Sequence, residues 1–211
     1  MKKIFSTIVI LLVGLSLNAQ EKPESFKKNQ FGIRAGTTVS NLKFDFGNDI
    51  IFQLKSKPSF YVGGFWERSF NEIFGITAGI TYADLESHFD METEEFKTVM
   101  HINYFSIPIG VKYYANQNLS LTGGIKTNIL ASTSVKSSNP EDSESSDSQE
   151  FVKKTNLLPY IGAEYRLFKN LHIETMYNFG VVNIAKDDSE ESFSEQKIKL
   201  GYFQLGFNYK L

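Results

Sequence analysis

The chain of 211 residues contains no cysteine. It therefore cannot form disulfides, use a thiol nucleophile or hold a metal through thiolates. Histidine is scarce, with three residues in all, and tryptophan occurs once. The net charge of −2 and the pI of about 6.0 lack the basic excess that nucleic-acid-binding domains carry. No nucleic-acid partner is expected.

Long apolar runs are absent beyond the N-terminus, and the mean hydropathy of −0.23 argues against a bundle of membrane helices. Lys2 and Lys3 precede a mostly apolar run over residues 4–17, and Ala19 supplies a small residue for cleavage. The run is shorter than the ~20 residues of a spanning helix, which disfavours a retained membrane anchor. We predict a secretory signal peptide over residues 1–19, a short periplasmic leader over residues 20–28 and one domain over residues 29–211.

Aromatic residues are abundant, with 19 Phe and 10 Tyr. Together with β-branched residues they recur in segments where apolar and small or polar residues alternate, a pattern that predicts β-strands. Eight such segments are present, over residues 31–40, 60–69, 74–82, 104–114, 119–129, 157–167, 171–179 and 201–211. In the second of them either Tyr61 and Phe65, or Phe60, Val62 and Trp66, could form the apolar face.

The predicted connections alternate in length. Short turns fall near residues 70–72, 115–118 and 168–170, and long connections over residues 41–58, 84–101, 132–156 and 185–196. Barrels that cross the outer membrane have short periplasmic turns and longer outer loops. The segments also reach the ~9–11 residues that a tilted strand needs to span the hydrocarbon. We predict an all-β fold, an eight-stranded antiparallel up-and-down transmembrane β-barrel of the outer membrane with both termini in the periplasm.

The second face of the segments is rich in Gly, Ser, Thr and Asn and poor in charge, unlike the water-facing side of a soluble sandwich. We expect it to line a narrow interior that side chains can fill, which favours a packed polar interior over a conducting pore. Buried charges persist only when paired. The residues expected to form this interior network are Arg34, Lys112, Lys126, Glu164, Arg166 and Glu174, with Glu67 as a further candidate.

The chain ends on the stretch GYFQLGFNYKL, whose apolar alternation continues to the last residue. Phe207, Tyr209 and Leu211 resemble the C-terminal signal that barrel-insertion machinery reads in outer-membrane proteins. Aromatic residues also recur near strand ends, as in the girdles that contact the membrane interfaces. The expected partners are therefore outer-membrane lipid and lipopolysaccharide together with the insertion machinery.

Three stretches also resemble one family. GIRAG at residues 32–36 with SNL at residues 40–42, INYFSIPIGVKYY at residues 102–114 and QLGFNYKL at residues 204–211 are similar to strands of the PorT-like outer-membrane β-barrel proteins of Bacteroidetes-type bacteria, small barrels of the OmpA/OmpX kind. Leu211 stands where Phe is commonest in that family. The family's named member is linked to export through the type IX system. The resemblance thus implies a barrel that assists secretion, with secretion components as further partners.

Catalysis is not expected. A Ser–His–acid set would have to use His88, His101 or His172; the first two flank a long connection and the third lies beside a short turn. The acidic stretches at residues 84–95, 139–150 and 187–191 could attract Ca²⁺ or Mg²⁺, but none matches a calcium-loop spacing. We predict no catalytic residue, cofactor site or metal site.

The predicted function is a non-enzymatic structural or adhesive platform with acidic extracellular loops, or an accessory to secretion. Two alternatives are a soluble periplasmic β-barrel that binds an apolar ligand and, less favoured, a lipid A-modifying barrel enzyme.

Overall fold

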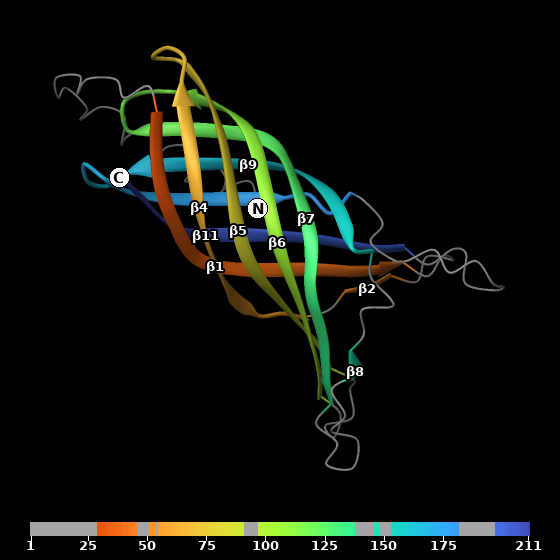
Figure 1. Ribbon diagram of the computed structural model, residues 1–211. Helices are drawn as coiled ribbons and strands as arrows, with labels where there is room; N and C mark the ends of the chain where they lie inside the picture. Colours follow the sequence, from red (N-terminus) through yellow and green to blue (C-terminus); the bar gives the residue numbers. More distant parts are fainter. Residues whose placement is uncertain are drawn as a thin grey trace, which may run out of the picture.

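The computed structural model describes residues 29–45, 51–53, 55–90, 97–137, 146–147, 153–181 and 197–211. The predicted signal peptide, the leader and the connection over residues 185–196 lie outside them. The described residues contain no helix long and apolar enough to cross a membrane. Eight long strands carry the fold (Figure 1): β1 (Asn29–Asp45), β4 (Pro58–Ser69), β5 (Phe74–Asp90), β6 (Lys97–Tyr114), β7 (Leu119–Ser137), β9 (Thr155–Arg166), β10 (Leu171–Asn178) and β11 (Lys197–Lys210).

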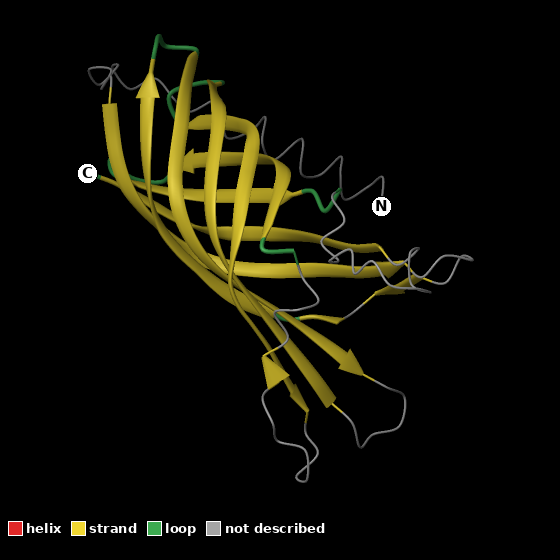
Figure 2. Ribbon diagram, turned by 45° about the vertical axis from the view of Figure 1, so that its right-hand side comes forward, coloured by secondary structure: helices red, strands yellow, loops and turns green. Residues whose placement is uncertain are grey.

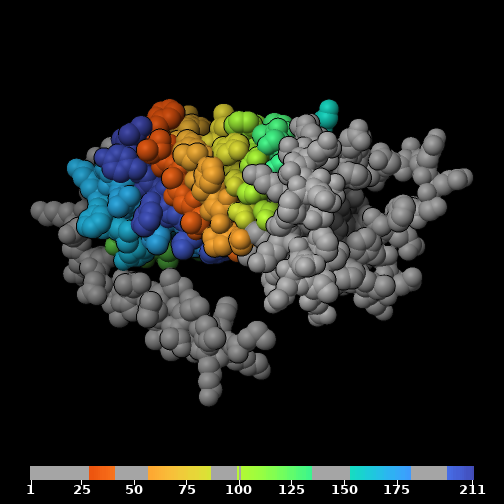
Figure 3. Space-filling model, turned by 90° about the horizontal axis from the view of Figure 1, so that it is seen from below, coloured from red at the N-terminus to blue at the C-terminus, as the bar shows by residue number. Residues whose placement is uncertain are grey.

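These strands form a closed antiparallel barrel. Each long strand pairs with the next in the order β1, β4, β5, β6, β7, β9, β10, β11, and β11 pairs back onto β1 from Gly32↔Lys210 to Asp45↔Lys197. In Figure 3 the blue surface of β11 lies against the red-orange surface of β1, where the ring closes. Closure leaves no open sheet edge along the paired residues, as a strand structure in lipid requires. The predicted eight-stranded antiparallel barrel is confirmed.

Side chains alternate between an apolar exterior that faces lipid and a polar interior. On β6, Ile109 is 61% exposed and points outward, whereas Ser106 and Lys112 are buried inside. On β4 the inward residues are Tyr61 and Phe65, so Phe60, Val62 and Trp66 occupy the outward positions. This resolves the ambiguity of the second predicted segment. The exterior is apolar because acyl chains, rather than water, are its solvent.

The three short turns lie where the sequence predicts them. In the first, the Asn71 side-chain oxygen accepts hydrogen bonds from the backbone nitrogens of Ile73 (2.9 Å) and Phe74 (2.7 Å). Asn116 does the same for the second turn, with Leu119 N at 2.9 Å. An asparagine that bonds the backbone two and three residues on is a common way to close a tight turn. The C-terminal residue lies at this end too, since Leu211 N donates to Phe31 O at 2.8 Å.

The predicted long connections over residues 41–58, 84–101 and 132–156 are wrong in extent, because much of each is strand. β5, β6 and β7 continue together past the start of β4 and form an extension that both views show (Figures 1 and 2). β1 and β11 also stay paired past that level, to Asp45↔Lys197. Short strands pair with the extended ones: β2 (Ile51–Gln53) with β1, β3 (Lys55–Ser56) with β5 and β8 (Ser146–Asp147) with β7.

An exchange of polarity between the two faces of the strands explains why the sequence predicts loops where the strands continue. Along β5 the outward residues are apolar up to Tyr82, but Asp84 and Glu86 follow on the same face. The inward face changes the other way, from Thr81 to Leu85, which is 1% exposed. The strand is continuous, while its solvent changes from lipid to water. In the sequence, the apolar alternation of the outward face ends at this point, and this pattern predicts a loop where the strand in fact continues.

On β7 a bulge accompanies the exchange. Tyr104 pairs with Leu130 but Asn103 pairs with Ser132, so Ala131 has no partner on β6. The extra residue shifts which side chains point inward, and Thr133 is buried as a result. Without the bulge, Thr133 would face outward.

An apolar cluster occupies the barrel interior at the base of the extension. Side chains from four strands pack into one cluster inside the barrel at this level: Leu85, Ile102, Tyr104, Leu158, Leu200 and Tyr202. Packing of apolar residues from opposite walls closes the described part of the barrel on the side away from the short turns.

Two aromatic belts delimit the apolar exterior. Near the short turns the rings of Phe74 and Tyr113 lie 5.6 Å apart, and toward the extension those of Tyr82 and Phe105 lie 5.5 Å apart. Phe74 and Tyr82 are eight positions apart on β5, which corresponds to about 27 Å of strand. At the usual tilt this is about 20 Å along the membrane normal, close to the apolar band of outer-membrane barrels. The extension beyond Tyr82 therefore lies outside the hydrocarbon.

Candidate functional site

Glycines on the inner wall make room for large polar side chains. A Cβ atom at Gly206 would collide with the hydroxyl group of Tyr61, and one at Gly110 with the hydroxyl group of Tyr160. Both tyrosines reach into the interior across these positions. A barrel of eight strands is narrow, so large interior residues need small ones opposite them.

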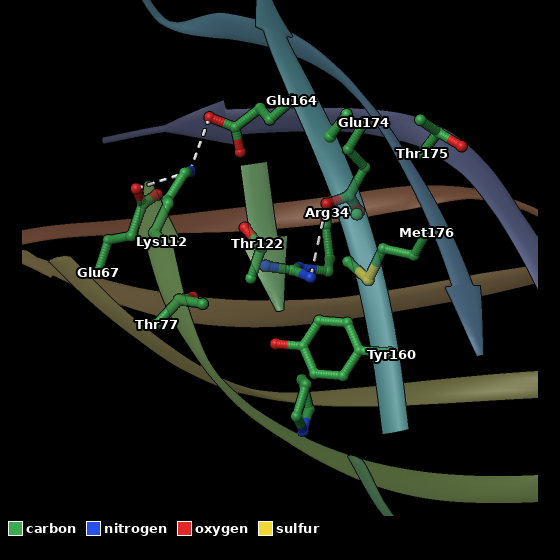
Figure 4. Close-up of a pocket in the computed structure, with 13 residues that line it drawn as sticks. Arg34, Glu67, Thr77, Lys112, Thr122, Tyr160, Glu164, Glu174, Thr175 and Met176 are labelled. Atoms are coloured by element: carbon green, nitrogen blue, oxygen red, sulfur yellow. Dashed lines mark ion pairs between the residues drawn. The ribbon is translucent and has the colours of Figure 1, made fainter. Parts of the chain in front are cut away.

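Four charged residues form the centre of the interior. Lys112 Nζ lies 2.7 Å from Glu67 Oε1 and 3.0 Å from Glu164 Oε1. Lys210 Nζ lies 3.0 Å from Glu67 Oε2 and 2.7 Å from Glu164 Oε1. Two ammonium groups and two carboxylates thus alternate, and their charges cancel. Figure 4 shows Lys112 between its two carboxylate partners.

A second cluster surrounds Glu174. Its carboxylate accepts hydrogen bonds from the Tyr61 hydroxyl group at 2.9 Å and from Asn208 Nδ2 at 2.8 Å. Arg34 Nη1 lies 3.5 Å from the same carboxylate. Asn208 Nδ2 also donates to Glu164 Oε2 at 2.8 Å. Asn208 therefore joins the two clusters into one network, which we call the interior network.

Lys126 is bound differently. Its Nζ donates to Gln204 Oε1 at 2.6 Å and lies 5.6 Å and 5.2 Å from the ring centres of Tyr160 and Tyr202. Aromatic faces attract cations, so two rings and an amide surround this ammonium group. Within the described part of the chain, Lys126 has no carboxylate at ion-pair distance.

The structure places five of the six predicted interior charges inside the barrel: Arg34, Lys112, Lys126, Glu164 and Glu174. Glu67 is buried with them. Arg166 is only partly buried near a short turn, where its Nε donates to Asn118 Oδ1 at 3.0 Å.

Sequence reasoning missed Lys210, Asn208 and Tyr61 as members of the network. The signal was present for the first two, since even positions of the last strand are polar. However, a lysine next to the final residue is ordinarily taken as solvated.

The interior leaves little free space. A cavity among the charged residues is about 20 Å³ in volume and is lined by residues that include Arg34, Lys112, Tyr160 and Glu174 (Figure 4). Such a volume holds about one water molecule. The described interior is thus a packed polar core rather than a water-filled channel.

The histidines do not form a hydrolytic set among the described side chains. Asp84 accepts a hydrogen bond from the Ser59 hydroxyl group at 2.6 Å and lies 3.3 Å from His101 Nδ1. The carboxylate stands between the hydroxyl group and the imidazole, whereas catalysis needs the imidazole in the middle. His172 is buried in the barrel, 4.0 Å from Glu164 Oε1. The side chain of His88 lies outside the described residues.

The barrel is closed, its exterior is apolar between two aromatic belts, and the charges of its central cluster balance. These features are those of an integral β-barrel protein of the outer membrane. The chain belongs to the family described as the outer membrane protein beta-barrel domain, whose model matches residues 18–186. The predicted localisation in the outer membrane is thereby supported. The apolar exterior argues against the soluble periplasmic barrel.

Solved structures of outer-membrane barrels resemble this fold. Ail, the attachment invasion locus protein of Yersinia pestis, in complex with the heparin analogue sucrose octasulfate, is 20% identical with a TM-score of 0.54, covering 88% of this chain and 100% of that one. Neisserial surface protein A is 15% identical with a TM-score of 0.46, covering 86% and 97%. At these identities the likeness is one of fold. No curated protein sequence matches the chain.

Proposed function

We propose that the protein is a non-enzymatic platform of the outer membrane that presents the β5–β7 extension and its acidic loops at the cell surface for adhesion. The observation that carries this proposal is the exchange of polarity on β5, where Asp84 and Glu86 follow Tyr82 on the outward face. A strand that continues into water with a buried apolar inner face is built to hold surface loops in place.

The closed interior supports a role at the surface rather than in transport. The interior network and the apolar cluster above it occupy the described barrel, and buried charges held in ion pairs give rigidity rather than passage. Asp84 separates Ser59 from His101, which supports a non-enzymatic role.

The ligand class follows from charge. Ail has been solved with a heparin analogue, a polyanion, whereas the sequence of this chain has acidic stretches at residues 84–95, 139–150 and 187–191, the first of which begins on β5. Like charges across an interface are costly. We therefore propose a neutral or basic partner at the cell surface.

The absence of cysteine makes the test direct. The variant Lys154→Cys places a thiol on the extension side of the barrel. The matched control, Gln117→Cys, places one in a short turn at the other end. Both residues are exposed. A membrane-impermeant maleimide applied to intact cells should label Lys154→Cys and spare Gln117→Cys. Labelling of the control alone would invert the topology and contradict the platform.

Adhesion itself needs a second measurement. Cells that display the barrel should bind a basic surface coated with polylysine more strongly than cells whose residues 139–150 are replaced by a neutral Gly-Ser linker. Equal binding by both, at equal surface expression, would count against an adhesive role for this loop.

A second candidate function, an accessory to secretion, rests on the resemblance of residues 107–114 and 204–211 to PorT-like barrels. A deletion strain should then export secreted proteases poorly; normal export would end this candidate. We further propose that Phe207, Tyr209 and Leu211, all exposed on the outward face of β11, form the signal for the insertion machinery.

A further inference from the structure

We propose that Lys210 acts as an electrostatic latch that closes the barrel: the strands before β11 present an acid-rich site, and the last strand neutralises it. The closing latch consists of Lys210 with Glu67 and Glu164. This inference is independent of the adhesive function, because it concerns how the barrel closes.

Lys210 spans the seam at which the barrel closes. β11 lies between β10 and β1, but Lys210 Nζ reaches past both neighbours, to Glu164 on β9 at 2.7 Å and to Glu67 on β4 at 3.0 Å. One ammonium group thus joins the two walls on either side of the seam. These two contacts can form only when β11 has come into place between β10 and β1.

The charge of the central cluster depends on β11. Without β11, the two carboxylates of the central cluster, Glu67 and Glu164, share the single ammonium group of Lys112, which leaves this cluster with one excess negative charge. Lys210 supplies the second ammonium group and makes the cluster neutral. An unpaired buried carboxylate is strongly unfavourable. The open barrel therefore holds an excess negative charge, and docking of β11 removes it.

A second side chain of β11 contacts the same acids. Asn208 points inward and donates to both Glu164 and Glu174 at 2.8 Å, so a second residue of β11 satisfies the same acids. The neighbouring residue Tyr209 points outward and is 45% exposed. The inward face of β11 thus carries the closing contacts, separately from the outward face.

The experiment measures closure directly in the full chain. A cysteine pair at Thr37 and Leu205, which are partners across the seam between β1 and β11, reports closure by forming a disulfide. A second pair at Ile109 and Ile125, partners between β6 and β7, reports an ordinary hairpin. The pairs are introduced in separate chains, refolded from urea into phosphatidylcholine vesicles, and samples are quenched with an alkylating agent over time.

Lys210→Met should slow seam disulfide formation at least about tenfold relative to the hairpin pair, as loss of one partner of a buried ion pair implies. Lys199→Met, an exposed lysine on the same strand, should leave the ratio unchanged. The double variant Lys210→Met with Glu67→Gln makes the network neutral again and should restore the rate to within about twofold of the original.

Equal slowing of both pairs by Lys210→Met, or no slowing, would overturn the latch. So would failure of Glu67→Gln to restore the seam rate, because the effect would then come from packing rather than charge. If Lys210→Met does not fold at all, the double variant decides: recovery of closure supports the latch, and continued failure overturns it.

Discussion

Thr38 on β1 donates a hydrogen bond of 2.7 Å from its hydroxyl group to the backbone carbonyl of Asp84 on β5, although β4 lies between these strands lower in the barrel. Ser40 repeats the contact two residues on, with Glu86 O at 2.7 Å. β4 begins only at Pro58, so these hydroxyl groups bond carbonyls near the place where β4 begins. The base of the extension is thereby joined directly to β1.

We expect Thr38→Val to destabilise the barrel by about 1–3 kcal/mol, because a partly buried carbonyl loses its donor while the side-chain volume is kept. Thr37→Val, on the outward face of the same strand, is the matched control and should change stability by less than about 0.5 kcal/mol. Urea titration with the heat-modifiable gel band as readout measures both. Equal effects would show that the hydroxyl of Thr38 has no special part in holding the extension.

Two buried lysines should respond oppositely to methionine. Lys112→Met leaves Glu67 and Glu164 short of a partner and should cost about 3–5 kcal/mol. Lys126→Met removes a cation without a described carboxylate partner and should be neutral or stabilising, since methionine fills a similar volume. Urea midpoints of the two variants in the same detergent give the comparison. A larger loss for Lys126→Met would contradict the assigned roles.

Steric room at Gly110 is a third test. Gly110→Ala should cost about 1–3 kcal/mol because the new methyl group meets the Tyr160 hydroxyl group. Tyr160→Phe in the same chain should recover part of this loss. Gly123→Ala, where a Cβ atom meets nothing within 4 Å, is the control and should fold as the original chain does. If the alanine at position 123 is equally harmful, the loss reflects the backbone and not the tyrosine.

The membrane boundary can be located with one substituent at two heights. Ile80→Lys places an ammonium group on the outward face below Tyr82 and should cost about 2–4 kcal/mol in lipid. Asn103→Lys places it on the outward face above Phe105, opposite Asp84 in the register, and should stay within about 0.5 kcal/mol. Folding equilibria in vesicles measure both. Similar costs would mean that the hydrocarbon extends past the aromatic belt.

The sequence predicts the barrel wall well because lipid imposes one rule on every strand. The outward residue must be apolar at each second position, and Ile107, Ile109 and Val111 on β6 follow it without exception. The turns can be predicted equally well, since Asn71 and Asn116 close two of them through their own side chains. Both signals are local, and local signals survive in a single sequence.

The β5–β7 extension and the pairing of charged residues in the interior cannot be predicted from the sequence in the same way. Above Tyr82 the alternation of β5 persists but its apolar member moves to the other face, and on β7 the bulge at Ala131 breaks the period altogether. The partners of Lys210 depend on which residues meet across the interior of the closed ring. That depends on the register of all eight strands, which no short segment encodes.

The bulge at Ala131 has a further consequence for adaptation to the bilayer. It marks where the outward face of β7 passes from Ile129 to Ser132. Moving one inserted residue two positions along the strand would shift that transition by about 7 Å of strand, with the inward contacts below it kept. A difference between strand height and hydrocarbon thickness costs fractions of a kcal/mol per Å. A single insertion site on β7 could thus tune the hydrophobic match of this wall of the barrel to membranes of different thickness.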